Sequence, residues 1–190
     1  MKFEWDEAKN LANQKKHGVS FEEAESLFAA DDYLEIFDEE HSESEERFIA
    51  IGLIRRGLIV VVWAFAEEET ARIISARFAT RKEEGLYEAY MGKDMTKIPE
   101  LTEEQFARSI PARVRRRLML GQFESGDDVA ALRRFVGLTQ VKFAQAMGIS
   151  VHTLRNWEQG RRRPEGSAIA LLRIAARHPR IIRENVETAA

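Results

Sequence analysis

The sequence contains no cysteine, and only 4 of its 190 residues are proline. Without thiols, disulfide frameworks and cysteine-ligated zinc sites are excluded. The longest apolar run covers residues 58–66, which is far short of the roughly 20 residues that a membrane-spanning helix needs. Charged residues such as Glu4 and Asp6 interrupt the N-terminal stretch, so it does not resemble a signal peptide. These absences favour a cytoplasmic protein with no membrane partner.

Charge is distributed unevenly along the chain. Residues 1–95 carry 12 Lys and Arg against 22 Asp and Glu, a net charge of −10, whereas residues 96–190 carry 17 against 10, a net charge of +7. Such asymmetry suggests different partners for the two halves, and the basic half is the better candidate for binding nucleic acid. Opposite charge also allows the two halves to attract each other.

The first half mixes helix and strand signals. Asp6 is a candidate cap for a helix that ends near Lys16, and the capping box at residues 20–23 opens a second helix. Four short segments rich in β-branched and aromatic residues follow, at 34–37, 47–54, 58–65 and 71–78. A second capping box at residues 80–83 opens a further helix. We therefore expect an α+β domain over residues 1–92, with a small antiparallel sheet and helices on one face.

The second half is predicted to be all-helical. Residues 93–101 lose all periodicity and contain Pro99, which is typical of a linker. From residue 102 to 190 the pattern is helical, and Gly137, Gly148 and Gly160 stand at the expected helix ends. The sequence thus predicts two domains, 1–92 and 102–190, joined by a short connection.

Residues 138–160 carry the densest motif. Thr139 and Ser150 are caps for two helices, and Gly148 ends the first helix just before the second begins. This stretch resembles the Cro-repressor class of helix-turn-helix proteins, and the resemblance covers a core at about residues 127–178. It implies a DNA-binding role, with side chains that contact bases or phosphates at Gln140, Val151, His152, Arg155, Asn156, Arg161, Arg162 and Arg163.

Residues 98–186 as a whole resemble antitoxins of the HigA or NadS type. This resemblance implies two partners: operator DNA, where the protein represses its own operon, and a cognate toxin. Helix-turn-helix repressors of this kind bind palindromic sites as dimers, so we expect a homo-oligomer.

The first half contains five fragments in a fixed order, at residues 3–6, 16–21, 40–42, 45–52 and 72–77. This series is similar to BrnT-type toxins, which are small RelE-like ribonucleases, and it covers nearly all of residues 1–92. The resemblance implies an RNA substrate, free or bound to the ribosome. It also implies a ribbon-helix-helix antitoxin, from which the helix-turn-helix half of this chain departs.

Cleavage of RNA without a metal requires an acid, a base and cations near the phosphate. His17 is the best acid–base candidate, and a helix C-terminus would favour its protonated form. Arg77, Arg81 and Tyr87 are candidates for contacts with the substrate. Each has a structural alternative: a helix-terminating role for His17, salt bridges to Glu83 or Glu84 for the arginines, and core packing for Tyr87. No cofactor is predicted, and no histidine pair has metal-ligand spacing.

The segment at about residues 100–123 is predicted to bind the toxin domain near its acidic loop, residues 38–46. Its candidate contact residues combine apolar and basic side chains: Phe106, Val114, Arg116, Arg117 and Leu118. A solvated arginine face or a second DNA contact is the alternative explanation for the basic residues.

Three hypotheses remain at this point. The first is a fused toxin and antitoxin, with a ribonuclease domain restrained by its own regulator. The second is a DNA-binding repressor whose N-terminal domain is a catalytically inert dimerisation or sensing module. The third is a fusion produced by engineering or by a lost stop codon, since Met95 in the linker would be an ordinary start.

Overall fold

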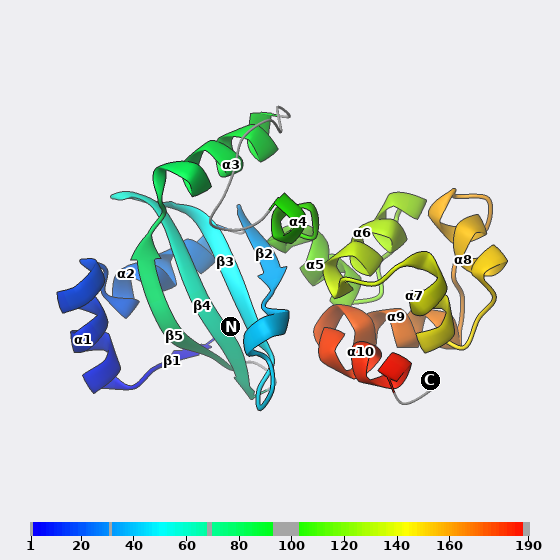
Figure 1. The fold of residues 1–190 in the computed structure, drawn as a ribbon, viewed down its shortest axis with the longest axis horizontal. Helices are drawn as coiled ribbons and strands as arrows, with labels where there is room; N and C mark the ends of the chain where they lie inside the picture. The colour runs from blue at the N-terminus through cyan, green and yellow to red at the C-terminus, as the bar shows by residue number, and fades with distance from the viewer. Residues whose placement is uncertain (1, 31, 68–69, 93–102, 188–190) are drawn as a thin grey trace. The chain divides into compact units, whose positions relative to one another are not determined.

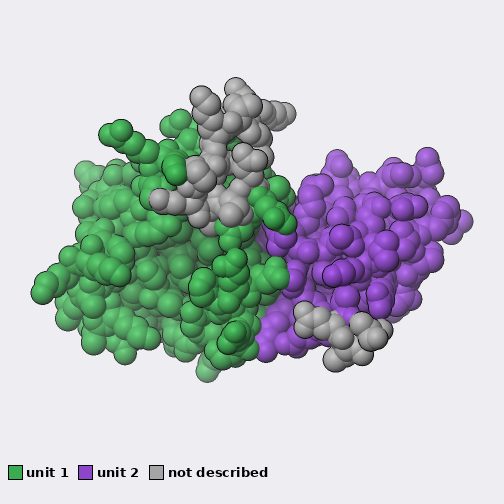
Figure 2. All heavy atoms as spheres, viewed as in Figure 1, with its two compact units in different colours: residues 1–107 green, residues 108–190 purple. Residues whose placement is uncertain are grey.

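The computed structural model describes residues 2–30, 32–67, 70–92 and 103–187. The chain divides into two compact units, residues 1–107 and 108–190, which Figure 2 colours separately. The linker expected at residues 93–101 lies outside the described residues. Within the described ranges, no helix has both the length and the apolar character needed to cross a membrane.

The first unit is built on a sheet of five strands in the order β1-β5-β4-β3-β2 (Figure 1). All neighbouring strands are antiparallel except β1, which runs parallel to β5. The strands are β1 (Lys2–Glu4), β2 (Tyr33–Phe37), β3 (Arg47–Ile54), β4 (Gly57–Glu67) and β5 (Thr70–Phe78). The helices are α1 (Glu7–His17), α2 (Phe21–Glu25), α3 (Arg81–Gly92) and α4 (Glu103–Ala107), with 3-10 turns η1 (Ser26–Ala29) and η2 (Glu39–His41).

Helices cover both faces of this sheet, not one face as the sequence suggested. On one face Phe28 of η1 packs against Trp63 of β4, with ring centroids 5.8 Å apart. On the other face Leu86 of α3 and Phe106 of α4 join a buried cluster with alternate residues of β2, β3 and β4. The central strands are apolar at consecutive positions, so each face needs its own cover.

The short strand β1 was not predicted, because its three residues are too few to give a clear strand pattern and because it pairs with Thr70–Arg72, far along the sequence. Beyond the residues that pair with β1, a side chain of α1 hydrogen-bonds to the backbone at the edge of β5. Asn13 of α1 donates to the Ala76 carbonyl at 2.7 Å and accepts from the Ala76 amide at 3.2 Å. This buried amide occupies both backbone groups of Ala76 and holds α1 against the strand.

The second unit is helical, as predicted. It begins with the two-residue extended segment β6 (Ile110–Pro111), followed by α5 (Ala112–Met119), α6 (Gly126–Val136), α7 (Gln140–Ala146), α8 (Val151–Glu158), α9 (Ser167–Arg177) and α10 (Pro179–Glu187). Its core contains fully buried apolar residues from α6, α7, α8 and α9, among them Leu132, Phe143, Leu154 and Leu172. Thr139 and Ser150 cap α7 and α8 as expected, and Gly148 adopts a positive φ of 65° in the turn between them.

Among the glycines described in the helical unit, Gly126 lies closest to the backbone of a neighbouring helix. A Cβ atom at this position would lie 2.3 Å from the Glu158 carbonyl oxygen and 2.6 Å from that of Trp157. Both are backbone atoms at the end of α8, so neither can rotate away. The glycine therefore fixes how the start of α6 packs against α8.

We predict that Gly126→Ala destabilises the helical unit by about 1–3 kcal/mol, because backbone must move to admit the methyl group. Gly85→Ala is the matched control: its Cβ would meet nothing within 4 Å, and it lies inside α3. There alanine should stabilise by up to about 1 kcal/mol through helix propensity. Urea unfolding followed by circular dichroism measures both, and equal effects of the two variants would contradict this packing.

Candidate functional sites

His17 lies at the C-terminal end of α1, one turn after Asn13, and is therefore held near the end of β5. Its side chain is partly buried. Burial, together with the positive charges of Lys16 and Arg77, lowers the pKa of His17. The expectation that the helix terminus favours the protonated form was wrong, because desolvation and two nearby cations act against it. A neutral imidazole at this position is suited to accepting a proton.

Arg77, at the end of β5, forms a two-pronged ion pair with Glu83 of α3, in which both N–O distances are 2.6 Å. Glu83 is fully buried and also accepts from the Thr80 amide at 2.9 Å. Burial opposes its ionisation, but the hydrogen bonds from Arg77 and Thr80 outweigh this and lower the pKa of Glu83. The salt bridge considered as an alternative for Arg77 is thus present. It fixes a guanidinium that remains 36% exposed.

The other two predicted substrate contacts lie in different environments. Arg81 begins α3 and is exposed. Tyr87 is buried in the apolar cluster, and its hydroxyl donates to the Asp32 carbonyl at 3.3 Å. Burial, and then the charge of Asp32, raises the pKa of Tyr87. The structure therefore places Tyr87 in the core, as its alternative explanation described.

Arg56 was not singled out from the sequence, where it belongs to a predicted tight turn. In the structure its guanidinium donates to the Gly18 carbonyl at 3.0 Å and to Glu23 at 2.9 Å. It also lies 5.1 Å above the ring of Phe78. Arg56 thus lies beside the C-terminal cap of α1, the residue directly after His17. No local sequence pattern could have indicated this, because Gly18 is 38 residues away.

In the helical unit, a chain of polar contacts orients Gln140 at the start of α7. Glu158 accepts from Arg133 at 2.6 Å and from Gln140 at 2.7 Å. The Gln140 oxygen in turn accepts from Arg155 at 3.2 Å. Gln140 and Arg155, both predicted to bind DNA, are therefore side by side. No sequence pattern singled out Arg133 and Glu158.

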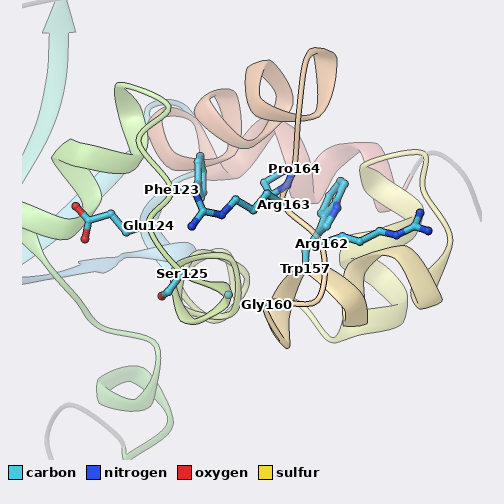
Figure 3. Close-up of a pocket in the computed structure, with 9 residues that line it drawn as sticks. Phe123, Glu124, Ser125, Trp157, Gly160, Arg162, Arg163 and Pro164 are labelled. Carbon is cyan, nitrogen blue, oxygen red and sulfur yellow. The ribbon is translucent and has the colours of Figure 1, made fainter.

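The remaining predicted DNA contacts lie on α8 or directly after it. His152 is exposed on α8, while Val151 and Asn156 are partly exposed. The loop that follows carries three exposed arginines, Arg161, Arg162 and Arg163. Figure 3 shows two of them beside a hollow of about 150 Å³ at the end of α8. Its lining includes two aromatic side chains, Phe123 and Trp157, two cationic ones, Arg162 and Arg163, and Pro164.

The residues predicted to form the contact between the two halves lie in different surroundings. Phe106 is fully buried in the apolar cluster of the first unit. Arg117 pairs with Asp128 of α6 at 2.7 Å, and Leu118 is fully buried on α5, which packs against α9. Val114 is partly buried and Arg116 is exposed.

The acidic loop before β3 contains a further ordered pair. His41 lies 2.9 Å from Asp38 through its Nδ1 atom, and Asp38 is itself buried. The hydrogen bond and the charge of Asp38 raise the pKa of His41. Among the described residues, no group of three or more histidines and carboxylates is arranged to hold a metal ion.

Comparison with known proteins gives two overlapping matches. Residues 5–83 match the family model of the ribonuclease toxin BrnT of type II toxin–antitoxin systems. Residues 74–186 match the model of MqsA, the antitoxin component of a bacterial toxin–antitoxin system.

Two individual proteins are also similar. Antitoxin HigA-2 of Vibrio cholerae serotype O1 is 40% identical over 55 residues, which are 29% of this chain and 53% of that protein. The chain thus matches about half the length of this relative. The crystal structure of the Brucella abortus ribonuclease toxin BrnT is similar at 29% identity with a TM-score of 0.35, covering 43% of this chain and 99% of that chain.

We predict that the two histidines of the first unit titrate in a fixed order. As the pH falls, His41 should take up its proton first, because its pKa is raised, and His17 should remain neutral to lower pH. NMR titration of the ring Cε1 protons measures both values. Asp38→Asn should lower the pKa of His41 alone, and Lys16→Gln should raise that of His17 alone. The reverse order in the unmodified protein would contradict the assignment.

Proposed function

Because the chain belongs to the MqsA antitoxin family over residues 74–186 and carries a BrnT-type toxin region before it, we propose that this fused toxin–antitoxin protein is a self-restrained ribonuclease and an autorepressor. Residues 1–92 supply the RelE-like toxin domain and residues 102–190 the antitoxin. The presence of both regions in one chain is the observation that carries this proposal. The protein is proposed to act in the cytoplasm, on RNA and on operator DNA.

The proposed cleavage begins with attack of the RNA 2′-hydroxyl on the adjacent phosphate, which forms a 2′,3′-cyclic phosphate and breaks the bond to the 5′-oxygen of the next nucleotide. The leaving 5′-oxygen takes a proton from water. His17 in its neutral form accepts the 2′-hydroxyl proton, which agrees with its lowered pKa. Arg77 and Arg81 stabilise the charge that develops on the phosphate oxygens. None of these steps requires a metal. Tyr87 contributes by supporting α3 from the core, not by touching the substrate.

Restraint of the toxin is proposed to depend on α4. Phe106 buries its ring in the same cluster as Leu86 and Tyr87 of α3, so the antitoxin side of the chain completes the toxin core. Burial of such a side chain is worth about 3 kcal/mol or less, enough to hold a short helix when the attachment is intramolecular. Arg117 and Leu118 then act indirectly, by keeping α5 folded, while Val114 and Arg116 are the candidates for further contact.

DNA binding is proposed for the pair α7 and α8, which form a helix-turn-helix. Val151, His152 and Asn156 face base edges, and Gln140 with Arg155 binds a backbone phosphate. Glu158 supports this phosphate contact because it fixes the Gln140 amide. The exposed arginines after α8 neutralise further phosphates. A dimer would present two such helices to a palindromic operator.

An inert N-terminal domain is the second candidate function. The ion pair between Arg77 and buried Glu83 favours it, since breaking that pair to bind RNA would leave a buried charge without a partner. In that case the protein is a repressor whose first unit serves dimerisation or sensing.

We predict that expression of residues 1–92 arrests growth and degrades RNA, and that His17→Ala removes the effect. Co-expression of residues 95–190 should restore growth. Phe106→Asp in the rescuing fragment should prevent rescue, because a charge cannot enter the apolar cluster, while the matched Phe123→Asp should still rescue. RNA integrity in cells, and cleavage by purified protein in EDTA, are the measurements. No cleavage of free or ribosome-bound RNA by folded protein would favour the inert domain.

We predict distinct effects of two substitutions on DNA binding by the full chain. Asn156→Ala should relax base preference at one operator position, with a loss of about 1–3 kcal/mol of discrimination. Arg162→Ala should weaken binding to all sequences alike and reduce the slope of log K against log salt by about 1. Gel-shift titrations at several salt concentrations separate the two effects. Unchanged titrations for both variants would exclude α8 and its loop as the DNA-binding surface.

A further inference from the structure

We propose that Arg47 and Arg72 form a second phosphate-binding position for a single-stranded RNA, and that Glu45 occupies this position when RNA is absent. This inference rests on the proposed ribonuclease function, since it extends the substrate path away from His17 and Arg77. The proposed ligand is a phosphodiester of the RNA. The two arginines lie near the start of β5, whereas Arg77 lies near its end.

The strand register places the two arginines on one face of the sheet. Arg47 of β3 is opposite Ala64 of β4, and Ala64 is opposite Arg72 of β5. Side chains of directly opposed residues in antiparallel strands point to the same face. The two arginine side chains therefore lie on the same face of the sheet, one on each side of Ala64, which is fully buried.

Glu45 bridges the two arginines. One carboxylate oxygen accepts from Arg47 at 3.1 and 3.3 Å, and the other accepts from Arg72. The three side chains are partly open to solvent, with exposed fractions of 32% for Arg47, 43% for Arg72 and 26% for Glu45. Two guanidinium groups around one planar anion are also the arrangement that binds a phosphate through paired N–H donors. The carboxylate thus stands where a phosphate would bind.

The loop that carries Glu45 is held in place independently of this bridge. The Asp38 amide donates to the Arg47 carbonyl at 3.0 Å, and the Arg47 amide donates to the Ser42 hydroxyl at 2.9 Å. His41 contacts both carboxylate oxygens of Asp38. Because these contacts do not involve Glu45, its side chain can rotate away while the loop keeps its shape.

The proposed position at Arg47 and Arg72 lies on the same strand face as Arg77. Ser75 is opposite Val62 and Arg77 is opposite Val60, so Arg72, Ser75 and Arg77 share one face of β5 despite the bulge between them. Five residues of strand span roughly 15 Å, a distance that a few nucleotides can cover. A strand of RNA that follows β5 would therefore meet a cation at each end.

The negative charge of the surrounding loop affects how strongly this position binds a phosphate, and Glu45 adds to that effect. The loop also carries Glu39, Glu40, Glu43 and Glu46, which repel a phosphate and keep its affinity low. With Glu45 in place, the two arginines are neutralised further. Removal of that one carboxylate should have a larger effect on RNA binding than its distance from His17 would suggest.

The experiment uses the full chain and a fluorescein-labelled single-stranded RNA octamer with 2′-O-methyl groups, which prevent cleavage. Excess duplex DNA occupies the helical unit. Anisotropy titrations at several salt concentrations should show Arg72→Gln and Arg47→Gln binding more weakly. Each should lower the slope of log K against log salt by about 0.7, the value for one single-strand phosphate contact. Glu45→Gln should bind at least about threefold more tightly, because it removes a partly exposed ionic competitor. Lys9→Gln, an equal charge loss on α1, is the control.

The outcomes distinguish this inference from the proposed function. If Arg77→Gln weakens binding while Arg72→Gln and Glu45→Gln match the unmodified protein, the second position is wrong and the ribonuclease proposal stands. If the unmodified protein and Glu45→Gln both fail to bind RNA, both proposals fail. If Lys9→Gln weakens binding as much as Arg72→Gln, the effect is one of net charge, and the assigned site is wrong. Thermal unfolding by circular dichroism verifies that each variant is folded.

Discussion

A sheet that is apolar on both faces is the constraint on which the first unit depends. One face is covered by η1, whose Phe28 packs on Trp63. The other is covered by α3 and by Phe106 of α4. Because α4 follows the toxin-like region along the chain, the burial of Phe106 that helps to cover this face also anchors the segment that leads into the second unit. The proposed restraint of the toxin region would therefore use ordinary core burial.

Buried carboxylates position the functional side chains in both units. Glu83 fixes Arg77 at the end of β5, and Glu158 fixes Gln140 at the start of α7. In each case the carboxylate is nearly inaccessible, whereas the side chain that it orients reaches solvent. Loss of either carboxylate would remove the ion pair or hydrogen bond that holds its partner side chain, so we expect both residues to matter although the proposed function gives them no contact with RNA or DNA. Glu45 differs from these two carboxylates because its side chain is 26% exposed. In the proposed site, a phosphate can therefore displace it from the two arginines.

Local signals predicted much of the fold. The caps at Asp6, Ser20, Thr139 and Ser150 each appear with the expected hydrogen bond, because capping involves residues only three positions apart. The strands β2 to β5 also lie where segments rich in β-branched and aromatic residues indicated them. By contrast, β1 depends on a partner strand far along the chain, and its three residues carry no pattern of their own.

The sequence by itself determined the two-part organisation, the helix pair with its predicted DNA-binding side chains, and the family resemblance of each half, because these follow from local periodicity and from motifs with fixed spacing. Only the tertiary structure decided which side chains are brought together. It put Arg56 beside Gly18, buried Tyr87, paired Arg77 with Glu83 and placed Glu45 between two arginines on different strands. The physical reason is that strand register and helix docking set such distances, and both are fixed by packing across the whole unit, not by neighbours in the sequence.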